Sequence, residues 1–282
     1  MRSPLPIGLD EVHLWLCFYA GITDQRLLES YRDVISPDER AQEGKFYFAR
    51  DRHRYLVTRA LVRTVLSRYA SVHPGAWQFA SNAYGRPEIA NPELSDAGLS
   101  FNISHTSGLI VLVVTKHRAV GVDVENLAER NASLELANHY FSPAEAIALA
   151  RVPAHRQQHR FFEYWTLKEA YIKARGMGLS LPLDKFAFHF PCDRRIAISI
   201  HPSLGDNPSR WQLWQFQPAP EYLMALCAER INTLPGAVSI RRIEPMAADA
   251  PLLLGPTRIS TEGVSEGLGG SASLPASGST SN

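Results

Sequence analysis

The sequence predicts an α+β fold in which helices pack on small sheets. Short runs of apolar or alternating residues, typical of strands, are interleaved with longer segments whose apolar residues recur at helical spacing. The chain has 282 residues, 45% of them hydrophobic, which is enough for a substantial core and for one large domain or two of ordinary size. We therefore expect a globular protein.

The charge balance and the cysteines exclude several classes of protein. A formal net charge of +1 gives no overall attraction to nucleic acid or to a membrane, so any recognition of an anion must be local. Cys17, Cys192 and Cys227 lack metal-ligand spacing, and their odd number argues against a disulfide framework. The first apolar run, residues 12–22, is too short to span a bilayer. The expected location is a reducing cytoplasm.

The N-terminal region predicts a strand followed by helices. Residues 12–22 form the expected strand, and a short helix follows at residues 23–31. Ser36 is a typical N-cap and Pro37 suits the first helical position, so a second helix should begin there. Residues 45–69 have helical periodicity, with basic residues concentrated at the start. These basic residues could hold a phosphate, but a surface helix made soluble by arginine is an equally good interpretation.

Two short motifs follow this helix. Residues 81–89, SNAYGRPEI, predict a turn that leads into a strand, because Gly85 is conformationally permissive and Pro87 fixes φ. Residues 101–105, FNISH, precede a further apolar run. Taken alone, His105 would more often be a hydrogen-bonded structural histidine than a ligand-binding one.

The apolar run predicts one strand of a hairpin. Residues 109–114 are short enough for a buried strand, and a tight turn at residues 116–118 leads to a second strand at residues 119–125. The hairpin is expected to bring His105 and Asp123 into one neighbourhood.

The second strand carries two acids on one face. Asp123 and Glu125 alternate with valines, so both side chains project in the same direction. Two carboxylates at this spacing repel each other unless a cation lies between them, and an oxygen-only site suits magnesium better than zinc. The alternative is a strand end with an acidic, solvent-exposed face.

Two helices are expected next, at residues 133–140 and 143–150. The second has Ser142 as N-cap, Pro143 at its first position and Glu145 at its third, which is the spacing of a capping box. Glu145 therefore has a structural explanation.

A further helix is expected over residues 161–175, and an Arg-Gly pair ends it. Trp165, Glu169 and Lys173 are four positions apart, so they lie on one stripe of the helix, and Lys168 lies beside that stripe. An acid and two bases therefore flank one another next to an indole. The alternative is a solvated helix with an ordinary ion pair between Glu169 and Lys173.

The remaining sequence predicts a second sheet and a tail. Strand-like segments occur at residues 186–190, 196–200, 211–217 and 222–228. From residue 247 to 282 the composition shifts to Gly, Ser, Thr, Ala and Pro, which cannot bury enough surface to offset ordering entropy. We expect a disordered tail whose deletion leaves stability nearly unchanged.

Together these motifs resemble the 4′-phosphopantetheinyl transferases of the surfactin-synthetase-activating type. That family has a G-x-D-x-E strand and, some forty residues later, the helical pattern W-x-x-K-E-A-x-x-K-x-x-G-x-G-L. The matching residues are Gly121, Asp123, Glu125, Trp165, Lys168, Glu169, Ala170, Lys173, Gly176, Gly178 and Leu179. The resemblance covers roughly residues 10–230 and is much more specific than any single dipeptide.

The resemblance implies a fold, an activity and partners. The fold consists of two similar α/β halves, each a small, mainly antiparallel sheet with packed helices, expected here at residues 1–116 and 117–246. The activity is transfer of 4′-phosphopantetheine from coenzyme A to a serine of an apo acyl or peptidyl carrier protein, with release of adenosine 3′,5′-bisphosphate. Magnesium is the expected cofactor, a monomer the expected state, and no contact with nucleic acid or membrane is expected.

The resemblance also assigns roles to individual residues. Metal binding falls to Asp123, Glu125 and Glu169. Either Glu169 or Glu145, acting through water, is the expected base, and Lys173 with Lys168 is expected to stabilise the leaving oxygen. The residues expected to contact coenzyme A are Lys45, Arg50 and Arg54 at the 3′-phosphate, Gly85, Arg86 and Pro87 at the adenine end, and Ser104, His105 and Lys173 near the diphosphate.

The sequence is also compatible with two other functions. A magnesium enzyme acting on another nucleotide diphosphate would have the same acids and basic patch, and a carrier-protein-binding module could have lost turnover. The sequence does not reveal which carrier protein or pathway is served, how broad the substrate range is, or which carboxylate is the base.

Overall fold

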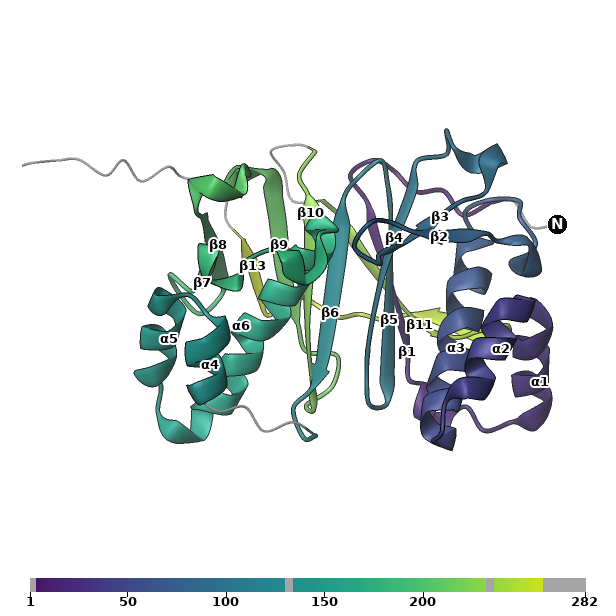
Figure 1. The fold of residues 1–282 in the computed structure, drawn as a ribbon, viewed down its shortest axis with the longest axis horizontal. Coiled ribbons are helices and arrows are strands. Elements are labelled where there is room, and N and C mark those ends of the chain that lie inside the picture. The colour runs from purple at the N-terminus through teal and green to yellow at the C-terminus, as the bar shows by residue number, and fades with distance from the viewer. Residues whose placement is uncertain (1–3, 130–133, 232–235, 261–282) are drawn as a thin grey trace, which may run out of the picture.

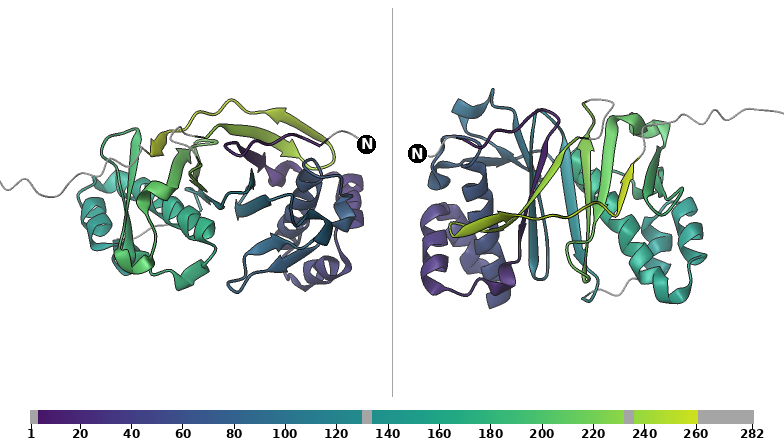
Figure 2. Two further views of the ribbon diagram at one scale, coloured as in Figure 1. Left: turned by 90° about the horizontal axis from the view of Figure 1, so that it is seen from above. Right: turned by 180° about the vertical axis from the view of Figure 1, so that it is seen from behind.

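Two sheets stand side by side at the centre of the computed structural model, which describes residues 4–129, 134–231 and 236–260 (Figure 1). Their inner faces pack against each other and helices cover both outer faces, giving four layers in the order helix, sheet, sheet, helix (Figure 2). None of the helices in these ranges has the length and apolar character that crossing a membrane requires.

The first sheet has strand order β12-β11-β1-β5-β4 and the second β6-β10-β9-β13-β8-β7. Most neighbouring strands are antiparallel; β1 with β11 and β13 with β8 are parallel. The expected α+β class and the two helix-covered sheets are confirmed. The strands are β1 (Val12–Cys17), β2 (Phe79–Ser81), β3 (Pro87–Ile89), β4 (Leu99–Thr106), β5 (Leu109–Lys116), β6 (Val120–Asn126), β7 (Phe186–His189), β8 (Arg195–Ile200), β9 (Trp211–Phe216), β10 (Tyr222–Glu229), β11 (Val238–Glu244), β12 (Ala248–Pro251) and β13 (Arg258–Ser260).

The helices form two groups, and each group covers the outer face of one sheet. The group on the first sheet is α1 (Gln25–Val34), α2 (Pro37–Lys45) and α3 (Ala49–Leu66), and the group on the second is α4 (Leu134–Tyr140), α5 (Pro143–Ala150) and α6 (Ala154–Arg175). Helix α6 begins seven residues before the expected Phe161, because its first two turns are polar and carry no apolar periodicity.

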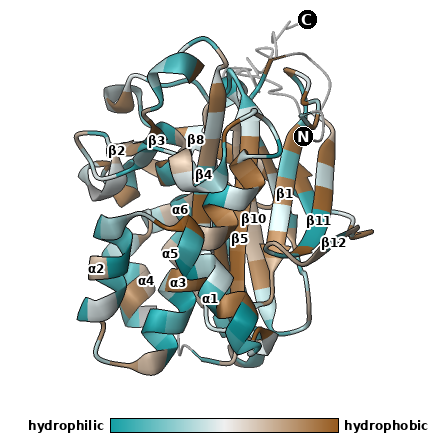
Figure 3. Ribbon diagram, turned by 90° about the vertical axis from the view of Figure 1, so that its right-hand side faces the viewer, coloured by the Kyte–Doolittle hydropathy of each residue, from teal (hydrophilic) through white to brown (hydrophobic). Residues whose placement is uncertain are grey.

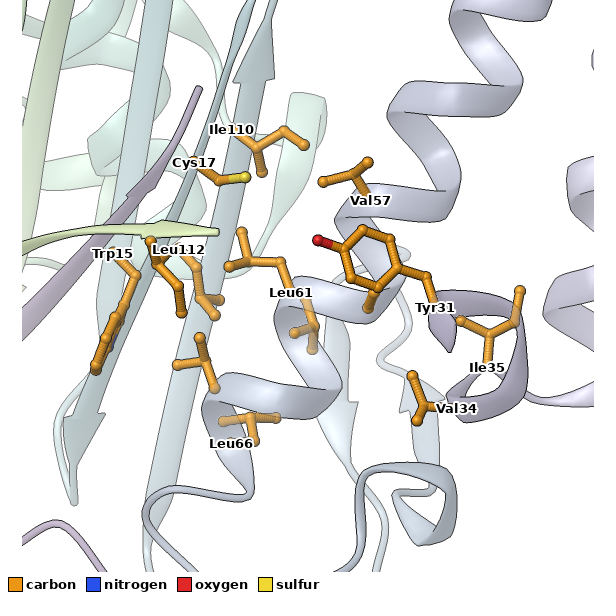
Figure 4. Packing of buried hydrophobic residues seen from close by; sticks show 14 of the residues in the cluster. Trp15, Cys17, Tyr31, Val34, Ile35, Val57, Leu61, Leu66, Ile110 and Leu112 are labelled. Carbon is orange, nitrogen blue, oxygen red and sulfur yellow. The ribbon is translucent and has the colours of Figure 1, made fainter. Parts of the chain in front are cut away.

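Strand β5 shows how the layers share their core. Val111 and Val113 pack toward the second sheet, while Ile110 and Leu112 pack toward α3 and α1 (Figure 4). Both faces of the strand are therefore buried, which explains its unbroken apolar sequence. Coloured by hydropathy, the strands of this side are largely hydrophobic and the helices mix both kinds of residue (Figure 3).

The local signals for helix ends are confirmed. Ser36 and Glu39 form a reciprocal capping box at the start of α2, and Ser142 and Glu145 form another at the start of α5. Helix α6 ends at Gly176, which has the left-handed backbone conformation, with φ of 66°.

The expected hairpin between residues 109–114 and 119–125 is wrong. Strand β5 pairs with β1 on one edge and β4 on the other, so it has no edge left for β6. Strand β6 pairs instead with β10 in the second sheet. The chain therefore passes from one sheet to the other at the turn between β5 and β6.

The expected second half, 117–246, and disordered tail, 247–282, also need correction. Strand β11 belongs to the first sheet through its parallel pairing with β1, and β12 continues that sheet. The chain then crosses to the second sheet, where β13 lies between β9 and β8 (Figure 2). Composition did not reveal this because much of the order comes from backbone pairing and ion pairs, including Arg68–Asp249 at 2.6 Å, and only a few apolar residues, Leu252, Leu254 and Ile259, pack against the core. Residues 261–282 lie outside the described residues.

Candidate active site

Side chains of β4 connect the edges of the two sheets. Strands β4 and β6 are edge strands of different sheets. Three β4 side chains accept hydrogen bonds from backbone N–H groups of β6: Asn102 from Val122 at 2.9 Å, Ser104 from Val124 at 3.4 Å and Thr106 from Asn126 at 3.1 Å. Polar residues at alternate strand positions are a sequence signal for this β4–β6 junction, but they do not reveal the opposite strand.

Helix α6 crosses the outer face of β6 at Gly121. A Cβ atom at this position would lie 2.1 Å from the carbonyl oxygen of Ala170 and 2.3 Å from the nitrogen of Ala174, so only glycine permits this approach. Because Asp123 lies two residues further along the same face, the crossing brings it next to α6. Gly121 therefore positions the acidic strand against the helix that carries Glu169 and Lys173.

Asp123 is the centre of a buried polar cluster. Its Oδ1 atom accepts hydrogen bonds from Lys173 Nζ at 2.7 Å and from Ser104 Oγ at 2.9 Å. Lys173 Nζ also lies 3.0 Å from Ser104 Oγ. The structure thus brings together three residues that the sequence places on a strand, a second strand and a helix. Ser104 thus contacts Asp123 in this arrangement, and its expected contact with the diphosphate stays a prediction.

The carboxylates near this cluster suit a hard cation by their donor chemistry. The Oδ2 atom of Asp123 is buried and has no hydrogen-bond partner among the described residues, and Glu125 is only 6% exposed. Burial raises the pKa of Glu169, and the negative charge of Asp123 adds to the increase while Lys173 opposes it. In the described ranges no three acidic, histidine or cysteine side chains already converge in metal-binding geometry. The donors present are all oxygens, which Mg²⁺ prefers, although they are not assembled around one point.

Glu169→Gln is expected to stabilise the metal-free protein at neutral pH. Because the folded-state pKa of Glu169 lies above its unfolded value, ionisation opposes folding; this penalty is absent below the unfolded pKa and complete above the folded pKa. The gain should therefore grow as the pH rises from about 4 to about 7. Thermal midpoints of both proteins across this range, without divalent cations, measure the effect. A difference that does not change with pH would contradict the proposed cause.

A cavity of about 270 Å³, here called the cleft, opens beside this cluster. It is lined by Glu169 and Lys173 on α6, by Gly85 and Arg86 on the β2–β3 turn and by Pro87 at the start of β3. The structure therefore brings the residues expected at the adenine end of coenzyme A to the same cavity as Glu169 and Lys173 of α6.

Arg86 has a structural role in the cleft. Its guanidinium donates to the carbonyls of Lys173 at 2.8 Å, Val120 at 3.1 Å and Phe101 at 3.3 Å. These bonds tie α6, β6 and β4 together, and burial lowers the pKa of Arg86. The backbone carbonyls of the α6 C-terminus thus gain a cationic partner, as the helix dipole favours.

The other expected contacts of coenzyme A divide into two groups. His105 lies near the end of β4 with part of its side chain exposed. The part that packs against the protein is desolvated, which lowers the pKa of His105, and the positive charge of Arg54 lowers it further. Arg54 forms an ion pair with Asp51 at 3.0 Å within α3 and is not among the residues that line the cleft. Lys45 and Arg50 are exposed on the surface, and in the described residues no contact connects them with the cleft.

Glu145 and Lys168 form a separate, fully buried ion pair. Their charged atoms are 2.8 Å apart, and neither side chain is exposed to solvent. Glu145 also accepts hydrogen bonds from the backbone N–H groups of Ser142 and Phe188, both at 2.9 Å, and Lys168 donates to the carbonyl of Phe186 at 2.9 Å. Lys168 also donates to the carbonyl of Leu183 at 2.8 Å. Neither Glu145 nor Lys168 lines the cleft, so the structure does not bring them to it.

Glu145→Ala is expected to lower the free energy of unfolding by about 3–5 kcal/mol, because it leaves the Lys168 ammonium buried without its counter-ion. Urea unfolding measures this loss. The exposed acid Glu221 offers a matched control, and Glu221→Ala should change stability little. If Glu145→Ala were as stable as the wild type, the pair would not have the structural role described.

Comparison with known protein families divides the chain at the same place as the two sheets do. The family model "4′-phosphopantetheinyl transferase, N-terminal" matches residues 24–117, and the "4′-phosphopantetheinyl transferase superfamily" model matches residues 119–227. The two matches meet at the turn where the chain passes between the sheets. Both matched regions contribute residues to the cleft.

The match to each of three individual relatives covers most of that relative's length. 4′-Phosphopantetheinyl transferase Sfp of Bacillus subtilis is 36% identical over 200 residues, which are 71% of this chain and 84% of that protein. 4′-Phosphopantetheinyl transferase HetI of Nostoc is 36% identical over 171 residues, 61% of this chain and 71% of the relative. Another Bacillus subtilis 4′-phosphopantetheinyl transferase is 32% identical over 195 residues, 69% of this chain and 82% of the relative. The chain therefore belongs to the 4′-phosphopantetheinyl transferase superfamily.

Proposed function

We propose that Asp123, Glu169 and Lys173 carry out in this cleft the reaction for which the family is named. The 4′-phosphopantetheinyl group of coenzyme A is transferred to a serine hydroxyl of an apo carrier protein, and adenosine 3′,5′-bisphosphate leaves. The observation that supports the assignment is the Asp123–Lys173 contact at 2.7 Å beside a cavity that also holds Glu169.

The chemistry needs proton removal from the serine and charge stabilisation on the diphosphate. A new bond forms between the serine oxygen and phosphorus, and the bond from that phosphorus to the bridging oxygen breaks. Lys173, a cation beside the cleft, would stabilise the bridging oxygen as it leaves. Of the two candidate bases, Glu169 lines the cleft and Glu145 is committed to Lys168, so we assign proton removal to Glu169.

Asp123, Glu125 and Glu169 would hold magnesium, which would neutralise charge on the diphosphate oxygens when bound. Because a carboxylate has two oxygens, Glu169 can serve both as a ligand and as the proton acceptor. Ser104 would keep Asp123 oriented through the hydrogen bond at 2.9 Å. The cytoplasmic location and the monomeric state stay predictions.

Arg54→Ala is expected to raise KM for coenzyme A at least about tenfold, because a charge-assisted contact to phosphate contributes roughly 1.5–3 kcal/mol. The KM for 3′-dephospho-coenzyme A should hardly change, since that substrate lacks the phosphate. Arg26→Ala, which removes an exposed arginine of α1, is the matched control and should change neither KM. Equal changes for both substrates would remove Arg54 from the phosphate site.

The proposed function is tested by incubating the protein with coenzyme A, Mg²⁺ and a panel of apo carrier proteins. Mass spectrometry should show that a carrier gains one phosphopantetheinyl group on its serine. Parallel reactions with other nucleotide diphosphates distinguish the rival magnesium enzyme. A carrier that binds but never gains mass, across the whole panel, would support a module without turnover and reject the proposal.

A further inference from the structure

A second cavity, of about 430 Å³, lies at the connection between α5 and α6, and β13 also contributes to its lining. Its lining residues on α6 lie in the first half of the helix, whereas those of the cleft lie in its last two turns. Arg156 lines it, and Glu169 of the cleft lies thirteen positions further along the helix, or roughly 20 Å at about 1.5 Å per residue. The proposed transfer reaction does not use this space.

Arginine dominates the charged lining of this arginine cavity. Two carboxylates oppose four guanidinium groups, which leaves two positive charges in excess among these side chains. The residues are Arg151, Arg156, Arg160 and Arg258 with Glu163 and Asp193. The whole chain has a net charge of only +1, so this is a local concentration of positive charge.

Two of the arginines are held in place before any ligand arrives. Arg160 and Arg258 each stack on the ring of Phe190, with their guanidinium carbons 4.6 Å from its centroid. Both also form ion pairs with Glu163, which is 4% exposed. Burial alone would raise the pKa of Glu163, but His159, Arg258 and Arg160 outweigh burial and lower it to about 2. Glu163 therefore stays ionised and fixes both guanidinium groups.

Unused hydrogen-bond donors remain around the cavity. The Nε atom of Arg258 is buried and has no partner among the described residues. Within those residues, Arg151 and Arg156 form no ion pair and both side chains are exposed. The N-cap of α6 is Pro153, which provides no side-chain acceptor for the free N–H groups of the first helical turn. The positive end of a 22-residue helix thus adds to the arginine charge.

We propose that the arginine cavity binds a compact divalent oxyanion, namely the phosphate group of a small molecule or inorganic phosphate itself. Two excess positive charges match a dianion, and guanidinium forks match the geometry of its oxygens. The volume exceeds what a single phosphate fills, so an attached organic group can be accommodated. This site is independent of the proposed transfer reaction.

Thermal midpoints of the full chain without coenzyme A test the proposal. Inorganic phosphate and glycerol phosphate are titrated against chloride at equal ionic strength, because binding to the folded state raises the midpoint. Arg151→Ala/Arg156→Ala removes two exposed side chains and should lower the phosphate affinity about tenfold or more. Arg26→Ala/Arg40→Ala, which removes equal charge from exposed positions on α1 and α2, should keep the full response.

Lys173→Ala separates this site from the cleft, because it alters the cleft and should leave the phosphate response unchanged. A stronger response to glycerol phosphate than to inorganic phosphate would identify a phosphorylated small molecule as the ligand, and an equal response would identify phosphate itself. The proposal fails if the wild type does not respond, if the Arg151/Arg156 variant responds like the wild type, or if Lys173→Ala loses the response. If the Arg151/Arg156 variant had a raised KM for the carrier protein but an unchanged phosphate response, the proposal would be rejected and the cavity would be assigned to contact with the carrier protein.

Discussion

Asp123→Ala is expected to remove nearly all carrier loading while the protein still folds. The change abolishes a carboxylate of the proposed magnesium site and releases Lys173, whose ammonium lies 2.7 Å from Asp123 Oδ1. Removing one preorganised charge-stabilising group typically lowers kcat by about 10²–10³-fold, and here two groups lose their positions together. Loading rates measured by carrier mass, with thermal midpoints of the same samples, separate lost catalysis from lost folding.

The same site should behave as a unit. Asp123→Ala/Glu169→Ala should be little slower than either single variant, because the two carboxylates act on one proposed cation. Asp184→Ala removes an exposed acid from the protein surface and is the matched control. Chelation should stop loading by the wild type and added Mg²⁺ should restore it, with Ca²⁺ less effective because it prefers longer bonds and more ligands. Near-normal turnover of Asp123→Ala, or loading that persists after chelation, would reject the shared-metal site.

Local features of this site could be predicted from the sequence because each depends on a short stretch of chain. The two-residue strand period places Asp123 and Glu125 on one face, and the four-residue helical spacing aligns Glu169 with Lys173. The capping boxes are also local, since Ser142 and Glu145 are three residues apart. Nothing beyond the immediate neighbours is needed for these features.

Features that depend on distant strands could not be predicted in this way. Lys168 lies next to Glu169 in sequence, yet it faces Glu145 and β7, because a step of one residue on a helix rotates the side chain by about 100°. The side chain of Asn102 bonds to β6 only because two sheet edges meet, and no local pattern specifies that meeting. The sequence also predicts that His105 and Asp123 are close, but it does so through a β5–β6 hairpin, and these two strands belong to different sheets.

Ending the chain at residue 246 is expected to destabilise it strongly, whereas ending it at residue 260 removes none of the described structure. The shorter chain lacks β13, which is the only connection between β9 and β8 in the strand order of the described second sheet. It also lacks Arg258, a counter-ion of buried Glu163, and Asp249, which pairs with Arg68 and Arg241.

These losses are large compared with the stability of an ordinary domain. Leaving a buried charge without any partner costs about 3–5 kcal/mol, against a total of roughly 5–15 kcal/mol. Glu163 keeps Arg160, so the loss of Arg258 contributes part of such a cost, and the lost strand pairings of β12 and β13 add to it. At about 2–4 °C per kcal/mol, the midpoint should fall by roughly 10 °C or more, and soluble yield should fall with it. Arg258→Ala tests one contact without shortening the chain and should reproduce part of the decrease. A 246-residue protein with the wild-type midpoint would show that β12 and β13 contribute little, and that the second sheet holds together through its helices.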